Sequence, residues 1–147
     1  MKQKNKAITL IELLVVIGIL IATSSMVVFF IRYQQPNISL YSNASALRSG
    51  MQLARKLAIS KQIPHSVHFD TVNHAYQVAE LGEMPKIISN RALSNGIEFT
   101  DVGPYAAEEL TFNSSGAGNP AGSIVIKNAY NAEKIITVSP SGFIKVD

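Results

Sequence analysis

The sequence predicts an α+β protein in which a long membrane-spanning helix, kinked near Pro36 and continuing to about residue 61, packs on an antiparallel β-sheet domain. Three observations lead to this prediction. A continuous apolar run opens the chain, and an apolar stripe of helical period follows it. From His65 onward, short segments alternate between apolar and polar residues with a period of two. One helix followed by a run of short strands is typical of an α+β fold.

The first element is the apolar run at residues 8–31, in which Glu12 is the only charged residue. As a helix it would be about 36 Å long at 1.5 Å per residue, enough to cross a hydrocarbon layer of roughly 30 Å. Three lysines (Lys2, Lys4 and Lys6) precede it. By the positive-inside rule, they place the N-terminus in the cytoplasm and the following domain outside.

Glu12 is unexpected in such a run, because a charge at the centre of a membrane helix costs roughly 2.5 to 3.5 kcal/mol and usually marks function. A plain membrane anchor leaves this residue unexplained. A cleaved secretory signal also fits poorly, because the apolar residues continue beyond the small residues at 21–25. The simpler interpretation is a carboxylate near a helix N-terminus, favoured by the helix dipole.

The second element is a helix after Pro36, which should kink or interrupt the helical run because proline lacks a backbone donor. Asn37 or Ser39 would then cap a restart. Apolar residues recur beyond it at alternating spacings of four and three, which indicates a buried helical face. They are Leu40, Ala44, Leu47, Met51, Ala54 and Ala58, with Leu53 and Leu57 widening the stripe. The helix should stop before Pro64.

The remaining elements are short strands separated by turn-forming residues such as Ser94-Asn95-Gly96. Val67, Phe69, Tyr76 and Val78 should face the same way across a hairpin. The expected strands are SVHFD (66–70), AYQVAE (75–80), KIIS (86–89), GIEFT (96–100), ELTFN (109–113), SIVIKN (123–128), KIITVS (134–139) and GFIKV (142–146).

The charged and metal-binding residue types indicate no catalytic or nucleic-acid site. Three of the 13 Lys and Arg residues precede the apolar run, so the rest has 13 − 3 = 10 against 10 Asp and Glu. Nucleic acid is therefore not an expected partner, and the basic residues Arg48, Arg55, Lys56 and Lys61 form an ordinary solvated helix face. Cysteine is absent. His65, His68 and His74 lack further ligands, so we expect no metal, no cofactor and no enzyme activity.

The stretch KAITLIELLVVIGILIA (6–22) resembles the N-terminal signature of type IV pilins and of the pseudopilins of type II secretion. In that family a basic leader is cut off and the new N-terminal amine is methylated. The resemblance implies cleavage between Ala7 and Ile8 by a prepilin peptidase, and methylation of Ile8. The family usually has Gly before the cut and Phe after it, where this chain has Ala7 and Ile8.

The same resemblance implies an assembly role for Glu12 and Thr9. The carboxylate of Glu12 would pair with the amine of a neighbouring subunit and fix the register of the filament. The ending LTFNSSGAGNPAGSIVIKN (110–128) and KIITVSPSGFIKV (134–146) is similar to the GspH/FimT branch of the family. The expected organisation is therefore a leader at 1–7, a transmembrane and assembly helix at 8–31, and a GspH-like domain at 32–147.

These resemblances imply a minor pseudopilin, a structural subunit of the periplasmic pseudopilus of a type II secretion system. Its expected location is the inner membrane, crossed once, with a cytoplasmic N-terminus and a periplasmic globular domain. Its expected partners are other pseudopilins or pilins, the prepilin peptidase and membrane lipid. Two alternatives remain open from the sequence: a minor type IV pilin of a pilus or DNA-uptake machine, and a single-pass anchored binding domain.

Overall fold

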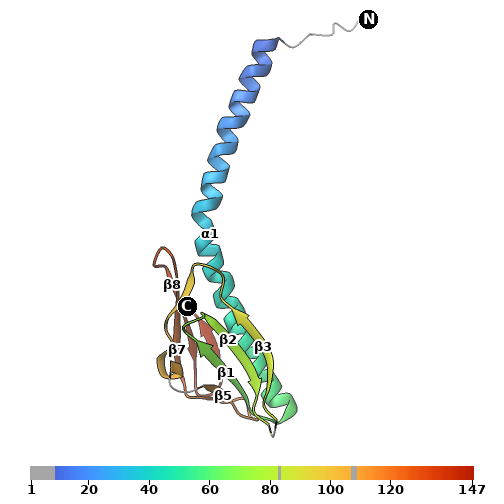
Figure 1. Cartoon of the computed structure of the whole chain (residues 1–147), viewed down its shortest axis with the longest axis vertical. Coiled ribbons are helices and arrows are strands. Elements are labelled where there is room, and N and C mark those ends of the chain that lie inside the picture. The colour runs from blue at the N-terminus through green and yellow to red at the C-terminus, as the bar shows by residue number, and fades with distance from the viewer. Residues whose placement is uncertain (1–8, 83, 107–108) are drawn as a thin grey trace, which may run out of the picture. The chain divides into compact units, whose positions relative to one another are not determined.

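The structure is a computed structural model that describes residues 9–82, 84–106 and 109–147. The chain forms two compact units, Met1–Gln35 and Pro36–Asp147. Helix α1 (Leu10–Lys61) begins in the first unit and ends in the second, and the strands all belong to the second unit (Figure 1).

Nine strands and one 3-10 helix follow α1 in the described part of the chain. They are β1 (His65–Asp70), β2 (Ala75–Glu80), β3 (Lys86–Ala92), β4 (Ile97–Asp101), η1 (Gly103–Ala106), β5 (Leu110–Phe112), β6 (Gly118–Asn119), β7 (Gly122–Asn128), β8 (Glu133–Val138) and β9 (Ile144–Val146).

These strands form two antiparallel sheets. A five-stranded sheet has the order β3-β2-β1-β5-β6, and a four-stranded sheet has the order β4-β7-β8-β9. In the first sheet Val67 pairs with Val78 and Phe69 pairs with Tyr76, so the apolar faces of β1 and β2 coincide. All four side chains are buried, which confirms their predicted common face.

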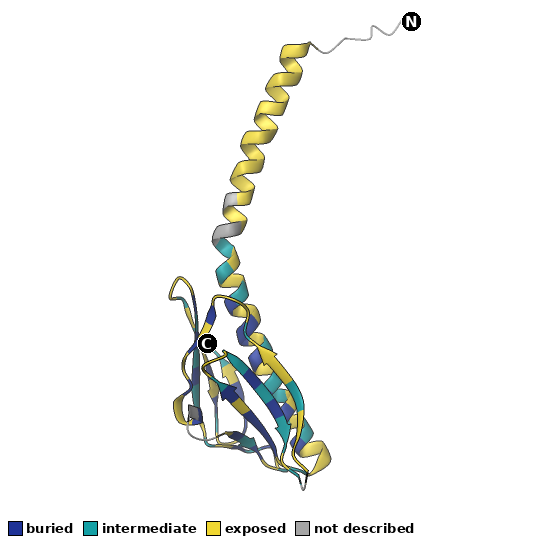
Figure 2. Cartoon of the chain, in the orientation of Figure 1, coloured by how far each residue is buried: buried dark blue, intermediate teal, exposed yellow. Residues whose placement is uncertain are grey.

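The apolar stripe of α1 forms one side of the core between the helix and the sheets (Figure 2). Its six predicted residues are each at most 2% exposed: Leu40, Ala44, Leu47, Met51, Ala54 and Ala58. Burying a side chain the size of Leu or Met contributes about 1.5 to 3 kcal/mol. The predicted α+β architecture is confirmed, and its helical stripe is the face that packs on the sheets.

Leu53 was wrongly assigned to the buried stripe. Its side chain is 39% exposed, whereas the neighbouring stripe residue Ala54 is fully buried. Leu53 lies one position before Ala54, and a step of one residue turns a helix through about 100°. Leu53 therefore lies at the border of the stripe, where the sheet no longer covers the helix.

Pro36 does not interrupt α1, which is helical from Leu10 to Lys61. A proline inside a helix costs about 3 kcal/mol or more. The following turns offset that cost through burial of Leu40 and Ala44. No capped restart occurs, so the capping roles expected of Asn37 and Ser39 were wrong.

The side chains after Pro36 make other hydrogen bonds. Asn37 Oδ1 accepts a hydrogen bond from Asn128 Nδ2 at 3.0 Å. Asn43 Nδ2 donates to the carbonyl oxygen of Ser39 at 2.7 Å, and Asn43 Oδ1 accepts from the backbone N–H of Ser94 at 2.9 Å. The bonds to Asn128 and Ser94 are long-range, and they hold the first turns of the second unit against the end of β7 and the loop before β4.

Helix α1 ends as predicted, before Pro64. Gln62 follows the last helical residue with a left-handed φ of 58°, a conformation common at helix C-termini. Its side-chain nitrogen donates to the carbonyl oxygen of Ile59 at 2.7 Å. This bond satisfies one of the carbonyls that the helix end leaves without an intrahelical partner.

The eight predicted strand segments each overlap one strand of the structure, whereas β6 and η1 were not predicted. Strand β6 has only two residues, beside the cis bond between Asn119 and Pro120. It pairs with the end of β5. Pairing of this kind depends on the neighbouring strand, and the Gly-rich sequence itself has no strand period.

Arg55 joins α1 to two loops at the far end of the sequence. Its Nε donates to the carbonyl oxygen of Gly116 at 2.9 Å, and an Nη atom donates to that of Ser141 at 3.2 Å. Gly142 approaches the same place so closely that a Cβ on it would lie 1.9 Å from the Gly116 oxygen. Glycine is therefore required at 142 by contact as well as by its φ of 75°.

We predict that Gly142→Ala destabilises the protein by more than about 3 kcal/mol, because backbone strain and overpacking each contribute about 1 to 3 kcal/mol. Gly96→Ala is the matched control. Gly96 has a similar φ of 82°, but nothing lies within 4 Å of a Cβ built on it. Urea unfolding of the detergent-solubilised chain measures both, and equal losses of stability would contradict the close contact at Gly142.

Candidate assembly site

Thr9 caps the N-terminus of α1. Its Oγ1 accepts a hydrogen bond from the backbone N–H of Glu12 at 3.3 Å, and its carbonyl oxygen accepts from the N–H of Leu13 at 3.2 Å. A Thr three residues before a Glu has the spacing of a capping box. Thr9 thus has a local role in beginning the helix, in addition to the assembly role that the resemblance implies.

Glu12 lies in the first turn of α1 with an exposed side chain. The ion pairs within the described residues do not include it. Its neighbours Leu10, Ile11, Leu13 and Leu14 are apolar and each more than half exposed. The carboxylate therefore lies on a hydrocarbon surface. The predicted cleavage and methylation residues, Ala7 and Ile8, lie outside the described residues.

The apolar part of α1 meets the requirements of a membrane span by length and composition. The segment Leu10–Val28 has 19 residues, a mean hydropathy of 2.4 and no residue buried inside the protein. Two of its polar side chains bond to its own backbone. The Thr23 hydroxyl donates to the carbonyls of Ile19 and Leu20 at 3.0 and 3.1 Å, and the Ser25 hydroxyl donates to that of Ile21 at 2.9 Å. Such internal pairing suits a lipid environment, where no water is present to form hydrogen bonds with these hydroxyls.

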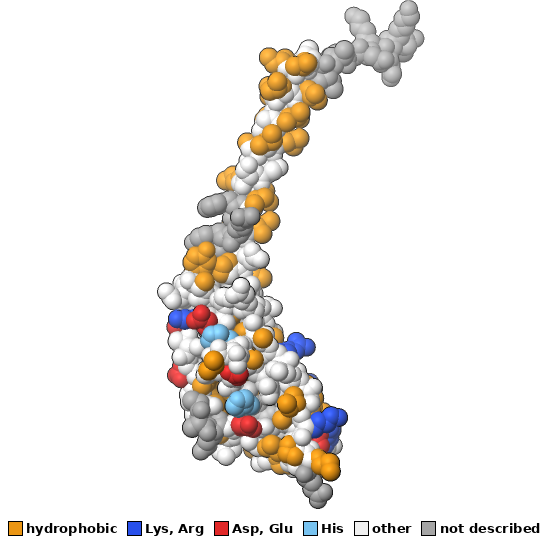
Figure 3. Space-filling view, in the orientation of Figure 1, with side chains coloured by type: hydrophobic (Ala, Val, Ile, Leu, Met, Phe, Trp, Pro, Cys, Tyr) orange, Lys and Arg blue, Asp and Glu red, His pale blue; other side chains and the backbone are white. Residues whose placement is uncertain are grey.

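The basic residues of the second half of α1 do not form one cationic surface. Arg55 is engaged with two loop carbonyls, and Lys61 is paired with Glu80. Arg48 and Lys56 remain exposed on the helix. On the face in Figure 3, the Lys and Arg side chains of the globular unit are scattered and partly adjacent to acidic ones. Binding of a phosphate backbone requires clustered cations, so this surface does not favour nucleic acid.

The histidines lie apart from one another in three different settings. His65 is fully buried, with Nδ1 2.8 Å from the carbonyl oxygen of Ile63 and Nε2 3.6 Å from Glu80 Oε2. His68 is exposed, and the Nδ1 of His74 accepts from the backbone N–H of Phe99 at 3.4 Å. Among the described residues, no group of three His, Asp or Glu side chains could hold a metal ion.

Glu80 and Tyr105 are among the titratable side chains of the globular unit whose pKa values are shifted. The hydrogen bond from Lys61 lowers the pKa of Glu80, and the charge of Lys61 contributes in the same direction. Burial raises the pKa of Tyr105 to about 12. The Tyr105 ring packs against Phe69 with ring centroids 5.5 Å apart. The pKa shift of Glu80 follows from its contact with Lys61, and that of Tyr105 follows from its burial.

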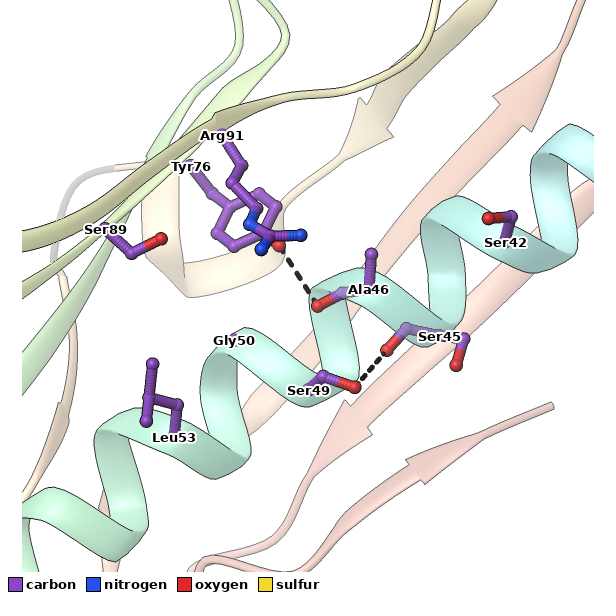
Figure 4. Close-up of a pocket in the computed structure, with 9 residues that line it drawn as sticks. All are labelled: Ser42, Ser45, Ala46, Ser49, Gly50, Leu53, Tyr76, Ser89 and Arg91. Carbon is purple, nitrogen blue, oxygen red and sulfur yellow. Dashed lines mark hydrogen bonds between the residues drawn. The ribbon is translucent and has the colours of Figure 1, made fainter.

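A groove of about 450 Å³ lies between α1 and the β3 side of the five-stranded sheet (Figure 4). Small residues of α1 form one wall: Ser42, Ser45, Ala46, Ser49 and Gly50. Tyr76, Ser89 and Arg91 lie on the sheet side, and Leu53 lies at one end. No sequence pattern predicts this groove, because its residues come from segments that only the fold brings together.

Tyr76 connects the sheet side of the groove to α1. Its hydroxyl donates a hydrogen bond to the carbonyl oxygen of Ala46 at 3.0 Å (Figure 4). A Cβ on Gly50 would lie 2.6 Å from Cε2 of the Tyr76 ring, so only glycine leaves room for this contact. Burial raises the pKa of Tyr76. The tyrosine therefore remains protonated and keeps its hydrogen bond to the helix.

A family model described as "Type II transport protein GspH" matches residues 43–142 of the chain. No curated protein matches it.

Among solved structures, the chain is similar to the minor pseudopilin EpsH from the type 2 secretion system of Vibrio cholerae. The identity is 15%, the match covers 74% of this chain and 96% of that one, and the TM-score is 0.63. It is also similar to the type IV minor pilin FimU of Pseudomonas aeruginosa. Here the identity is 19%, the coverage is 78% and 92%, and the TM-score is 0.64. Both likenesses show a shared fold of the pilin type.

Proposed function

The chain belongs to the family of the type II transport protein GspH, and from this membership we propose that it is a minor pseudopilin of a type II secretion system. The observation that carries the proposal is the family match over residues 43–142, which covers every strand except β9 and most of the helix half that packs on the sheets. The likeness to EpsH supports it. The role is structural: the chain assembles with other pilin-like subunits into a periplasmic filament.

The apolar helix supports a specific placement of the subunit. We propose that α1 holds it in the inner membrane before assembly, crossing once, with the N-terminus in the cytoplasm and the globular unit in the periplasm. A leader at 1–7, an assembly helix at 8–31 and a GspH-like domain at 32–147 remain the proposed organisation. Membrane lipid and a prepilin peptidase would be its partners at this stage.

A minor type IV pilin is the second candidate. The likeness to FimU is as good as that to EpsH, with TM-scores of 0.64 and 0.63. The fold alone therefore does not distinguish a type II secretion system from a type IV pilus. On the face of the globular unit drawn in Figure 3 the basic residues are scattered, which favours secretion over a DNA-uptake role, because binding DNA requires a cationic surface.

We predict that deletion of the gene abolishes export of enzymes by type II secretion while leaving surface motility and transformation unchanged. The three phenotypes are scored side by side in the native host, with the deletion complemented by the intact gene as the control. Loss of motility or transformation with normal export would instead support the pilus alternative. No defect in any of the three would support a single-pass anchored domain.

Processing gives a second prediction: the protein extracted from membranes begins with methylated Ile8 and lacks residues 1–7. Intact-mass and N-terminal peptide mass spectrometry measure both changes. An otherwise identical host without its prepilin peptidase is the control, and there the chain should keep Met1. A new N-terminus just after Ser24 or Ser25 would instead identify a secretory signal.

Glu12 is the residue proposed to fix the register between subunits. Its pairing with the amine of a neighbour would neutralise two charges that are each expensive in apolar surroundings. The Thr9 cap does not depend on the carboxylate, because Thr9 accepts from the backbone N–H of residue 12. Removal of the carboxylate therefore tests pairing without removing the cap.

We predict that Glu12→Ala lowers incorporation into the filament by more than about tenfold, since breaking a pair in apolar surroundings costs about 3 to 5 kcal/mol. Membrane insertion and leader cleavage should persist. Crosslinking to the major subunit measures incorporation. Glu98→Ala, which removes an exposed carboxylate from β4, is the control. Undiminished crosslinking of Glu12→Ala would reduce Glu12 to a residue favoured by the helix dipole.

A further inference from the structure

Strand β3 is the edge of the five-stranded sheet that borders the groove. It pairs with β2 on one side only, so part of its backbone donors and acceptors face outward. With seven residues it is longer than the other sheet edges, since β4, β6 and β9 have five, two and three. A long free edge can add a strand from another chain.

The protection of this edge is uneven along its length. Pro85 precedes β3, Lys86 is its first residue, and a register irregularity lies where β2 passes from Val78 to Ala79. Proline, lysine and a bulge are the devices that keep sheet edges from pairing. They protect the start of the strand. The other end, Ser89–Ala92, has no proline and no lysine, and its one charged residue is Arg91. This end supplies two of the residues that line the groove, Ser89 and Arg91.

The groove beside this open end is lined largely by small side chains, several of which carry hydroxyl groups. The α1 wall consists of small side chains, and the hydroxyls of Ser42, Ser45 and Ser89 take part in no hydrogen bond among the described residues. These hydroxyls are available as donors to an incoming chain. An extended segment that continues the sheet beyond β3 would cover the part of α1 where the sheet stops.

Arg91 gives the groove its charge. It is the one charged residue of the groove lining, and the ion pairs within the described residues do not include it. In register it lies opposite Tyr76, and its side chain extends over the groove toward the helix (Figure 4). A guanidinium group forms its strongest hydrogen bonds with carboxylates.

We propose that this groove is a docking site for an extended peptide segment bearing a carboxylate, which adds to the open end of β3 and pairs with Arg91. The source of the segment, a neighbouring pilin-like subunit, rests on the proposed function. The backbone edge would supply affinity without sequence preference, and Arg91 would select an acidic residue at one position.

Photo-crosslinking in the native host tests this docking site. A benzoylphenylalanine placed at Ser45 is in the groove wall, and one at Ser60 is the control on the same helix, outside the groove. We expect an adduct from position 45 to a segment of another subunit containing Asp or Glu, identified by peptide mass spectrometry. A third probe at Val16, in the apolar part of α1, reports filament assembly independently.

Substitution of Arg91 then tests the chemistry. Arg91→Glu should lower the yield of the position-45 adduct by about tenfold or more, as loss of a charge-assisted hydrogen bond predicts. Arg91→Lys should retain most of it. Arg48→Glu reverses an exposed charge on α1 outside the groove and should leave the adduct unchanged. Changing the identified acid to Lys should restore the adduct in the Arg91→Glu background.

The outcomes separate this inference from the proposed function. Adducts at Val16 without any at Ser45 would overturn the docking site and leave filament assembly standing. Adducts at Ser45 that survive Arg91→Glu would overturn the carboxylate as the recognised group. The thermal unfolding of Arg91→Glu should match that of the parent chain. If Arg91→Glu is less stable, two other results test the docking site: the adduct yield of Arg91→Lys, and recovery of the adduct when the identified acid is changed to Lys in the Arg91→Glu background.

Discussion

One constraint governs this protein: the single helix α1 has to be stable in two different surroundings. From Leu10 to Val28 its side chains are mostly apolar and nowhere buried within the protein, which suits hydrocarbon. Beyond Pro36 only one stripe is apolar, and that stripe forms a side of the core. The helical backbone serves both cases, because its hydrogen bonds are made within the segment and do not depend on the solvent. The two halves of α1 differ in which of their side chains are apolar, and not in backbone conformation.

Much of the fold was predictable because its signals are local. The stripe from Leu40 to Ala58 and the period of two in β1 and β2 were sufficient to place the helix, the strands and the buried faces. The features that sequence reasoning missed depend on distant partners. Arg55 was assigned to a solvated surface, but it bonds to carbonyls 61 and 86 positions away along the chain. Strand β6 exists only because β5 lies beside it.

The sequence predicted the assembly residues Thr9 and Glu12 but did not predict the groove beside β3. Thr9 and Glu12 were identified by a motif, and Thr9 indeed occupies a cap that the motif spacing explains. The assembly role of Glu12 stays a prediction. The groove had no sequence signal, since Gly50, Tyr76 and Arg91 meet only after the sheet has folded on the helix. Surfaces formed by tertiary contact of unrelated segments are outside the reach of periodicity and motifs.

The packing of the second half of α1 has a mechanical consequence. The buried residues from Leu40 to Ala58 are spread along the helix, and Arg55 adds two hydrogen bonds to loops of different strands. A force applied along the helix axis would load these contacts together, in shear, rather than one after another as in peeling. Sliding the helix would require many buried side chains to leave their positions at once. The globular unit should therefore resist unfolding when force is applied along α1.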